Sequence, residues 1–223
     1  MGDTVMIGAV IAMQKEADAL LCQMQGVTAL RHGGIDIYRG TFCKKDVVVA
    51  VSRIGKVYAA TAAAILIERY GVTALVNFGL SGAVNPALSV LDVVPVTRAV
   101  QYDFDLTLIN GTPLGTLNER DTPWFDLATP SLTPAGLGTA DRFSGEMKEA
   151  EFLREMGCYV RDMEGCAVAQ VAEQYGVPLY CWKVVSDVAG KNAPEEYAQN
   201  SQKAMDVLGK KLPEFFAQVG EKQ

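Results

Sequence analysis

Residues 164–187, with the sequence EGCAVAQVAEQYGVPLYCWKVVSD, are the stretch from which the fold is most directly predicted. Apolar residues recur on one face of residues 164–175, and this spacing predicts an amphipathic helix. Gly176-Val177-Pro178 marks the end of that helix, because glycine and proline interrupt helical structure. Residues 179–185 form an apolar run of the length expected for a buried strand. A helix joined by a short turn to a buried strand is the building unit of an α/β fold.

Similar units recur along the chain. Further strands are predicted at residues 4–11, 35–39, 46–51, 74–78, 93–97 and 158–161. Further helices are predicted at residues 14–24, 57–69, 146–156 and 195–219. Residues 110–137 are rich in Pro, Gly and Thr and are predicted to form an extended loop. We therefore predict one domain over residues 1–223, a three-layer α/β/α sandwich around a central mixed sheet.

The charge of the chain limits the class of its partners. The 223 residues carry a formal net charge of −6. Nucleic acid and anionic membrane surfaces are unexpected partners, because phosphate binding needs a basic surface. No apolar segment approaches the roughly 20 residues that a membrane-spanning helix needs, and the N-terminal residues lack the basic segment of a signal peptide. A small neutral or zwitterionic ligand is compatible with this charge.

Cysteine and histidine usage predicts a cytoplasmic protein without a metal centre. The five cysteines are scattered and include no C-x-x-C pair: Cys22, Cys43, Cys158, Cys166 and Cys181. An odd, dispersed set of this kind indicates reduced thiols in the cytosol. His32 is the only histidine, so a histidine-based metal site lacks ligands. We expect neither a metal ion nor a cofactor.

Two glutamates stand at predicted helix starts, and each has two interpretations. Glu16 lies in the first turn of the helix predicted at 14–24, and Glu164 opens the helix at 164–175. A carboxylate there stabilises the helix N-terminus without any role in function. The same position also directs Glu16 toward the carboxyl edge of the first strand, where α/β proteins bind ligands. Glu164 could instead accept two hydrogen bonds from a sugar diol.

Asp187 follows the apolar run 179–185, with Ser186 beside it. One interpretation is a turn that the aspartate side chain stabilises. The other is a partly desolvated carboxyl at a strand end, which can hold a proton near neutral pH and donate it to a substrate. Phe143 likewise fits either a core position or a platform for a planar base.

Gly79-Leu80-Ser81-Gly82 predicts a tight turn after the strand at 74–78. The turn is either a plain connection or a place where the backbone approaches a ligand closely. The spacing differs from G-x-G-x-x-G and from G-x-x-x-x-G-K-[ST], which disfavours dinucleotide and nucleoside triphosphate sites. G-x-S-x-G is absent too, and a single histidine makes a Ser–His or Cys–His pair unexpected.

In order and spacing, five segments resemble the 5'-methylthioadenosine/S-adenosylhomocysteine nucleosidases of the wider nucleoside phosphorylase/nucleosidase superfamily. They are residues 7–16 (IGAVIAMQKE), 52–57 (SRIGKV), 77–83 (NFGLSGA), 162–164 (DME) and 185–189 (VSDVA). The resemblance runs from Met6 to the C-terminal helix. It implies the nucleoside phosphorylase-like form of the α/β/α sandwich, a purine nucleoside as the small-molecule partner and a role in methionine salvage.

The resemblance also implies a hydrolytic mechanism that needs no cofactor. Asp187 would protonate the purine at N7, and Glu16 would orient and deprotonate the attacking water. The substrate-binding residues that it implies are Met13, Leu80, Ser81, Phe143, Ser144, Met163, Glu164 and Ser186. Among these, Glu164 would hold the ribose hydroxyls, Phe143 would stack on the base and Ser186 would steady Asp187.

Two alternatives to this hydrolysis stay open. Similar phosphorylases place a phosphate-binding arginine where this chain has Asn77, which favours hydrolysis, but Arg53 replaces a glycine of the family segment and could meet an anion. A nucleoside-binding protein that has lost the reaction is the other alternative. Leu80 and Arg142 depart from the family pattern and leave the substrate open, with a futalosine-type hydrolase as the nearest option.

The resemblance further implies a homodimer in which the neighbouring subunit supplies part of the pocket for the 5' substituent. Leu106, Leu108 and Ile109 form an apolar stretch at the corresponding place. We therefore expect two copies of the chain to associate through this region.

Overall fold

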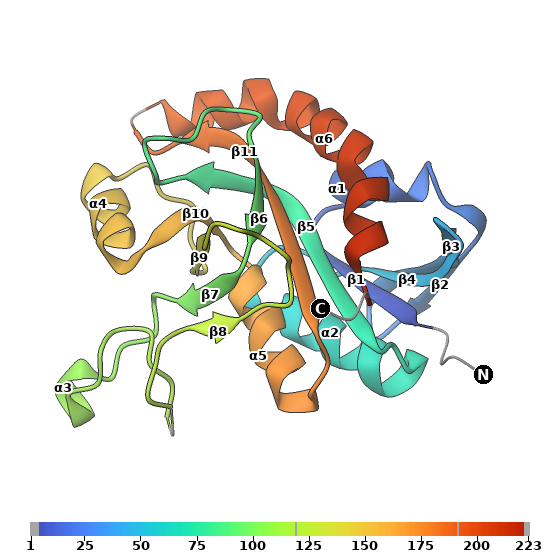
Figure 1. The fold of residues 1–223 in the computed structure, drawn as a ribbon, viewed down its shortest axis with the longest axis horizontal. Helices are drawn as coiled ribbons and strands as arrows, with labels where there is room; N and C mark the ends of the chain where they lie inside the picture. Colours follow the sequence, from blue (N-terminus) through green and yellow to red (C-terminus); the bar gives the residue numbers. More distant parts are fainter. Residues whose placement is uncertain (1–4, 119, 191, 221–223) are drawn as a thin grey trace.

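The computed structural model describes residues 5–118, 120–190 and 192–220. Its strands form one twisted mixed sheet that runs through the centre of the molecule (Figure 1). The strands are β1 (Met6–Ile11), β2 (Gln25–His32), β3 (Ile35–Phe42), β4 (Lys45–Val51), β5 (Ala74–Ala83), β6 (Val93–Val96), β7 (Arg98–Gln101), β8 (Phe125–Asp126), β9 (Gly136–Thr139), β10 (Cys158–Asp162) and β11 (Leu179–Val188).

Helices cover both faces of this sheet. The helices are α1 (Gln14–Leu21), α2 (Lys56–Tyr70), α3 (Thr107–Asn110), α4 (Met147–Met156), α5 (Gly165–Tyr175) and α6 (Ala193–Gln218). One apolar core lies between the sheet and the helices α2 and α5, and a second lies between the sheet and the helices α1 and α6. The predicted three-layer α/β/α sandwich with a mixed sheet is therefore confirmed.

Strand β5 is the axis of the sheet. Its first half pairs in parallel with β1, its last two residues pair antiparallel with β10, and β11 runs parallel to it along almost its whole length. All ten residues of β5 are buried. The predicted turn at Gly79–Gly82 is therefore wrong: the chain stays extended there, because β11 pairs with it throughout and β10 joins on the other side at Gly82.

Strand β11 also continues further than predicted. It includes Ser186 and Asp187, and a bulge between Val185 and Asp187 shifts its register against β5. The prediction that the strand stops before Asp187 is wrong, because the bulge lets pairing resume with Gly82. Bulges re-aim a side chain without ending the sheet, and here the re-aimed residue is a carboxylate.

Most predicted boundaries differ from the observed ones by a few residues. The predicted start of the first strand at Thr4 lies outside the described residues. Helix α2 covers the predicted range and ends at Gly71, whose φ of 65° is the left-handed conformation expected of a C-cap glycine. Two short strands, β8 and β9, begin inside the region predicted as a loop, at 110–137.

The strand β2 was absent from the sequence prediction. Seven of its eight residues are exposed, and the last is half-buried. It pairs antiparallel with β3 at the edge of the sheet. Because neither face of β2 is buried, its sequence lacks the apolar alternation from which strands are recognised.

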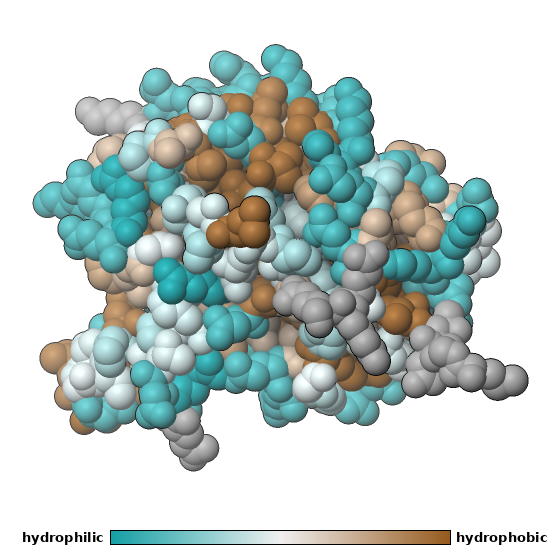
Figure 2. Space-filling view, viewed as in Figure 1, coloured by the Kyte–Doolittle hydropathy of each residue, from teal (hydrophilic) through white to brown (hydrophobic). Residues whose placement is uncertain are grey.

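The outer side of α6 is polar, as Figure 2 shows along the upper edge of the molecule. Helix α6 buries its opposite face on the sheet and continues through Pro213. Among the described residues, the helices are too short or too polar to cross a bilayer.

Candidate active site

A cavity of about 280 Å³ opens where β1, β5, β10 and β11 bring their ends together. We call it the central cavity. It is lined by Ala12, Met13, Glu16, Ile54, Leu80, Ser81, Gly82, Phe143, Arg161, Asp162, Met163, Glu164, Ser186, Asp187 and Tyr197. The carboxyl ends of parallel strands in α/β sheets are where ligand crevices form.

Glu16 enters the cavity from the first turn of α1. Its Oε1 accepts a hydrogen bond from the backbone N–H of Leu80 at 2.9 Å, and its Oε2 accepts one from the N–H of Met13 at 3.1 Å. A Cβ at Gly79 would lie 2.6 Å from Oε1, so this carboxylate can approach β5 only because residue 79 is glycine. The side chain therefore caps its own helix and also reaches the centre of the sheet.

Burial raises the pKa of Glu16 above its usual value. The hydrogen bond from Leu80 and the positive charge of Lys183 oppose that rise. The residue is only 3% exposed. A carboxylate of raised basicity is suited to removing a proton from water.

Asp187 enters from the bulge of β11 and is 1% exposed. The Ser186 hydroxyl donates to its Oδ1 at 2.7 Å, whereas its Oδ2 has no hydrogen-bond partner among the described residues. Burial raises the pKa of Asp187, while the Ser186 hydroxyl and the Arg161 guanidinium act in the opposite direction. One oxygen of this carboxyl is thus held in place by Ser186, while the other is buried 3.9 Å from the Arg161 guanidinium without a hydrogen bond in the described chain.

Glu164 stands at the N-terminus of α5. Its Oε1 accepts a hydrogen bond of 2.8 Å from the N–H of Gly55, in the loop before α2. Burial, together with the negative charge of Asp162, raises the pKa of Glu164 to about 7. A carboxylate is a strong acceptor for hydroxyl groups, so Glu164 can hold a diol once it is ionised.

A buried ion pair lies behind these carboxylates. Lys183 Nζ lies 2.9 Å from Asp162 Oδ2 and donates to Asn77 Oδ1 at 2.7 Å. Asp162 also accepts hydrogen bonds from the Thr139 hydroxyl and from the N–H of Gly165. These bonds fix β5, β10 and β11 relative to one another and hold Asn77 in place.

The structure brings together most of the residues that the sequence pointed to. Glu16, Asp187 and all the predicted substrate-binding residues except Ser144 line the central cavity. Ser144 does not line it: its hydroxyl accepts a hydrogen bond from the N–H of Glu146 at 3.1 Å, just before α4. Arg53 is exposed outside the cavity, and its guanidinium lies 5.5 Å from the centre of the Tyr58 ring.

Three residues around the site were missed from the sequence. Tyr197 comes from α6, where nothing in its spacing marks it, and its ring lies 5.8 Å from that of Phe143 in an edge-to-face arrangement. Arg161 is the penultimate residue of the short strand β10, and Lys183 lies within the apolar strand β11. Both gave a usable signal, because a charged residue in a buried strand needs a partner.

The arrangement suits the cleavage of a bond between a planar base and a sugar. Three carboxyl groups of raised pKa face one cavity: Glu16, Glu164 and Asp187. Aromatic and apolar side chains line its other sides, namely those of Phe143, Tyr197, Ile54 and Leu80. Among the residues described, no three His, Cys, Asp or Glu side chains are grouped so as to hold a metal ion.

Comparison with known proteins gives consistent matches. Residues 6–218 match the profile of the phosphorylase superfamily. The chain is 32% identical over 209 residues to the aminodeoxyfutalosine nucleosidase of Campylobacter jejuni, covering 86% of this chain and 91% of that protein. It is 32% identical over 216 residues to the 5'-methylthioadenosine/S-adenosylhomocysteine nucleosidase of Tolumonas auensis, covering 88% of this chain and 94% of that protein.

Solved structures agree with these matches. The crystal structure of S-adenosylhomocysteine nucleosidase from Streptococcus pyogenes, in complex with 5-methylthiotubericidin, has a TM-score of 0.90 to this chain. The two are 26% identical, and the alignment covers 99% of each chain.

Proposed function

Because the chain belongs to the phosphorylase superfamily, we propose that it hydrolyses the N-ribosidic bond of purine nucleosides, with 5'-methylthioadenosine and S-adenosylhomocysteine as substrates. The products are adenine and a 5-substituted ribose. One observation carries this proposal: Glu16, Glu164 and Asp187, from three separate elements, meet as buried carboxyl groups in one cavity. Nucleosidases named for these substrates are similar to the chain over most of its length.

The proposed division of labour follows from the charges that develop in the reaction. Breaking the bond places positive charge on the ribose ring and negative charge on the departing base. Asp187 donates a proton to N7 of the base, and burial supports this role because it raises the pKa of the carboxyl. Glu16 removes the proton from the attacking water, and Glu164 holds the ribose hydroxyls.

The remaining cavity residues bind and enclose the substrate in this proposal. Phe143 and Tyr197 offer an aromatic platform for the base, and Met13 and Met163 offer apolar contacts to the sugar and its 5' substituent. Ser186 holds Asp187 through its hydroxyl. Closing the site with apolar side chains strengthens electrostatic interactions inside it.

The direct test is base release from a panel of nucleosides, each with and without phosphate. We expect methylthioadenosine and adenosylhomocysteine to yield adenine at the same rate in both conditions. Release that requires phosphate and yields a sugar 1-phosphate would instead select a phosphorylase. No release from any member, with nucleoside binding intact, would indicate a binding protein.

A second substrate is favoured by a specific similarity. The aminodeoxyfutalosine nucleosidase of Campylobacter jejuni matches this chain as well as the methylthioadenosine nucleosidases do. Aminodeoxyfutalosine therefore belongs in the same panel. A kcat/KM for it that exceeds the value for methylthioadenosine would make it the main substrate.

We also propose that the chain acts as a cytoplasmic homodimer that associates through α3. Leu108 is fully exposed and Ile109 is 80% exposed. In Figure 2 brown atoms are visible at the protruding corner where Figure 1 places α3. Sedimentation should find a dimer at micromolar concentration, and Leu108→Glu should shift it toward monomer. A purely monomeric wild-type protein would contradict the proposal.

A further inference from the structure

Gly82 lies between two charged residues of neighbouring strands. In the sheet register it pairs with Arg161 of β10 on one side and with Asp187 of β11 on the other. Residues opposite one another in a sheet point to the same face. A Cβ at position 82 would lie 2.9 Å from Arg161 Nε and 2.9 Å from Asp187 Oδ2. The absence of a side chain at Gly82 therefore lets the guanidinium extend across β5 toward the carboxylate.

Arg161 is buried without being satisfied. It is 6% exposed, and its Nη2 lies 3.9 Å from Asp187 Oδ2, while its Nη1 lies 3.8 Å from Glu149 Oε1. Both separations exceed hydrogen-bond length, and neither nitrogen has a hydrogen-bond partner among the described residues. Buried charged donors without acceptors are costly, so such groups are expected to meet a ligand.

The nearby carboxylate of Glu149 does not supply the hydrogen bonds that the Arg161 guanidinium lacks. Glu149 already accepts a hydrogen bond of 2.8 Å from the Tyr102 hydroxyl and forms an ion pair with Arg142. Asp187 Oδ2 is also without a hydrogen-bond partner in the described chain. A buried donor on Arg161 and a buried acceptor on Asp187, neither with a hydrogen bond in the described chain, thus lie 3.9 Å apart in the wall of the cavity.

A purine offers a matching pair of groups on one edge. N7 is an acceptor in every purine, whereas the neighbouring 6-substituent is an amino donor in adenine and an oxygen acceptor in 6-oxopurines. Arginine commonly reads the O6 and N7 acceptors of a 6-oxopurine. An unpaired carboxylate oxygen suits the amino group instead. The Asp187 and Arg161 pair can therefore serve either kind of base.

On the basis of the proposed function, we propose that the central cavity accepts 6-oxopurine nucleosides as well as adenine nucleosides, and that Arg161 is the residue that reads the O6 oxygen. Arg161 donates to O6 while Asp187 serves N7. The same contact assists bond cleavage, because negative charge on a departing 6-oxopurine is shared with O6. A fixed positive group beside developing negative charge stabilises the transition state.

The test compares 5'-methylthioinosine with 5'-methylthioadenosine, two nucleosides that differ at the 6-position. The wild-type enzyme should cleave both, with values of kcat/KM within about tenfold of one another. Arg161→Met keeps length and apolar bulk but removes the donors. It should lower the ratio of the inosine to the adenosine kcat/KM by about 100-fold, the size of a lost specific hydrogen bond to a base. Arg154→Met, on the half-exposed side of α4, is the matched control and should leave the ratio unchanged.

A binding measurement separates this inference from the proposed function. Calorimetry with hypoxanthine and adenine should give measurable binding of both bases to wild-type protein. Hypoxanthine should lose about 100-fold in affinity relative to adenine in Arg161→Met. If neither nucleoside is cleaved but this shift is found, the hydrolytic function fails and the assignment of Arg161 stands. A wild-type protein that binds adenine but not hypoxanthine, or an unchanged ratio in folded Arg161→Met, would overturn it.

Discussion

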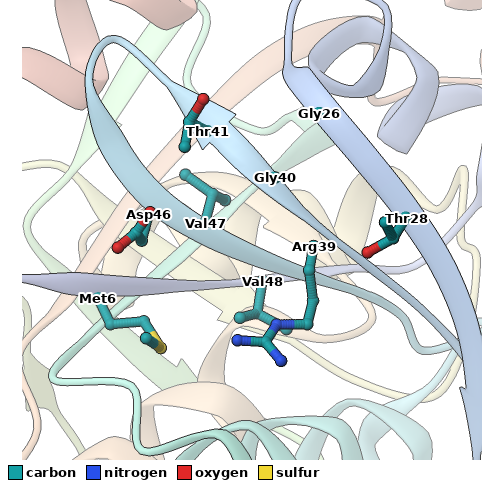
Figure 3. Close-up of a pocket in the computed structure, with 9 residues that line it drawn as sticks. All are labelled: Met6, Gly26, Thr28, Arg39, Gly40, Thr41, Asp46, Val47 and Val48. Carbon is teal, nitrogen blue, oxygen red and sulfur yellow. The ribbon is translucent and has the colours of Figure 1, made fainter.

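Two hollows of nearly equal size differ in how deeply their charged lining residues are buried. The central cavity measures about 280 Å³, and a groove over β2, β3 and β4 measures about 240 Å³ (Figure 3). The groove lies where β2 bulges away from β3, and its lining residues come from strands at the edge of the sheet and from Met6. Volume therefore does not distinguish a functional site from a surface irregularity here.

The charges distinguish the two hollows. Arg39 and Asp46, the charged residues of the groove, are exposed to solvent. The central cavity instead buries Glu16, Glu164 and Asp187, and burial raises the pKa of each. Burying charge is costly, so its concentration at one place indicates a function that compensates for the cost.

Neutralising one carboxylate in the central cavity and one in the groove should have very different effects on turnover. Asp187→Asn removes the proposed proton donor and should lower kcat by about 10³-fold, with a small change in KM. Asp46→Asn in the groove should change kcat by less than twofold. The measurement is the steady-state rate of adenine release. Near-normal turnover by Asp187→Asn would contradict the proposed mechanism.

Removing the buried Lys183 cation should destabilise the protein much more than removing the exposed Arg39 cation of the groove. Lys183→Met leaves Asp162 without its ion-pair partner and should lower the free energy of unfolding by about 3–5 kcal/mol. Arg39→Met in the groove removes an exposed charge and should change it by less than about 0.5 kcal/mol. Urea unfolding followed by circular dichroism measures both. Equal midpoints for the two variants would mean that the buried pair contributes little.

Replacing one glycine beside each hollow tests whether turnover depends on the backbone geometry of the central cavity and not on that of the groove. In Gly79→Ala the new methyl group would lie 2.6 Å from Glu16 Oε1 and should displace the carboxylate, lowering kcat by about 100-fold. In Gly40→Ala the methyl group would lie 2.7 Å from the carbonyl oxygen of Gln25, which should reduce stability and leave kcat within about twofold. Similar kcat values in the two variants would remove Glu16 from the mechanism.

The smallest expected effect concerns the pH dependence of stability. The pKa of Glu164 is about 7 in the folded protein and near 4.5 when unfolded, so the folded state binds the proton more tightly. Its contribution to stability is therefore complete below pH 4.5 and is lost as pH rises through 7, by at most about 3 kcal/mol. Glu164→Gln should flatten that decline, and Asp46→Asn should not. If the decline in stability with pH is unchanged in Glu164→Gln, the raised pKa of Glu164 is not its cause.

Sequence patterns predicted the helices and strands in which buried and exposed residues recur at regular spacing. The helix α2 and its left-handed Gly71 follow from an apolar face and a terminal glycine, and both are present. The exposed strand β2 carries no such pattern and was missed. Gly79–Gly82 was mistaken for a turn because glycine content does not report which strands lie on either side.

The site was predictable where residues lie in contiguous segments. Glu16, Glu164 and Asp187 each belong to a short segment with a recognisable order. Tyr197 reaches the cavity through helix packing, which no local pattern encodes. Arg161 is marked only by its charge in a buried strand, and strand register, which the sequence does not show, brings it to the cavity. Ser144 neighbours Phe143 in sequence, but its hydroxyl turns to the start of α4 instead.

The origin of the oxygen in the sugar product tests the central claim most directly. Methylthioadenosine is incubated with the enzyme in ¹⁸O-labelled water, in phosphate buffer and in its absence, and the sugar is analysed by mass spectrometry. Hydrolysis at the central cavity predicts one ¹⁸O atom in methylthioribose and the same rate in both conditions. Sugar 1-phosphate without the label, or no product in the absence of phosphate, would contradict it.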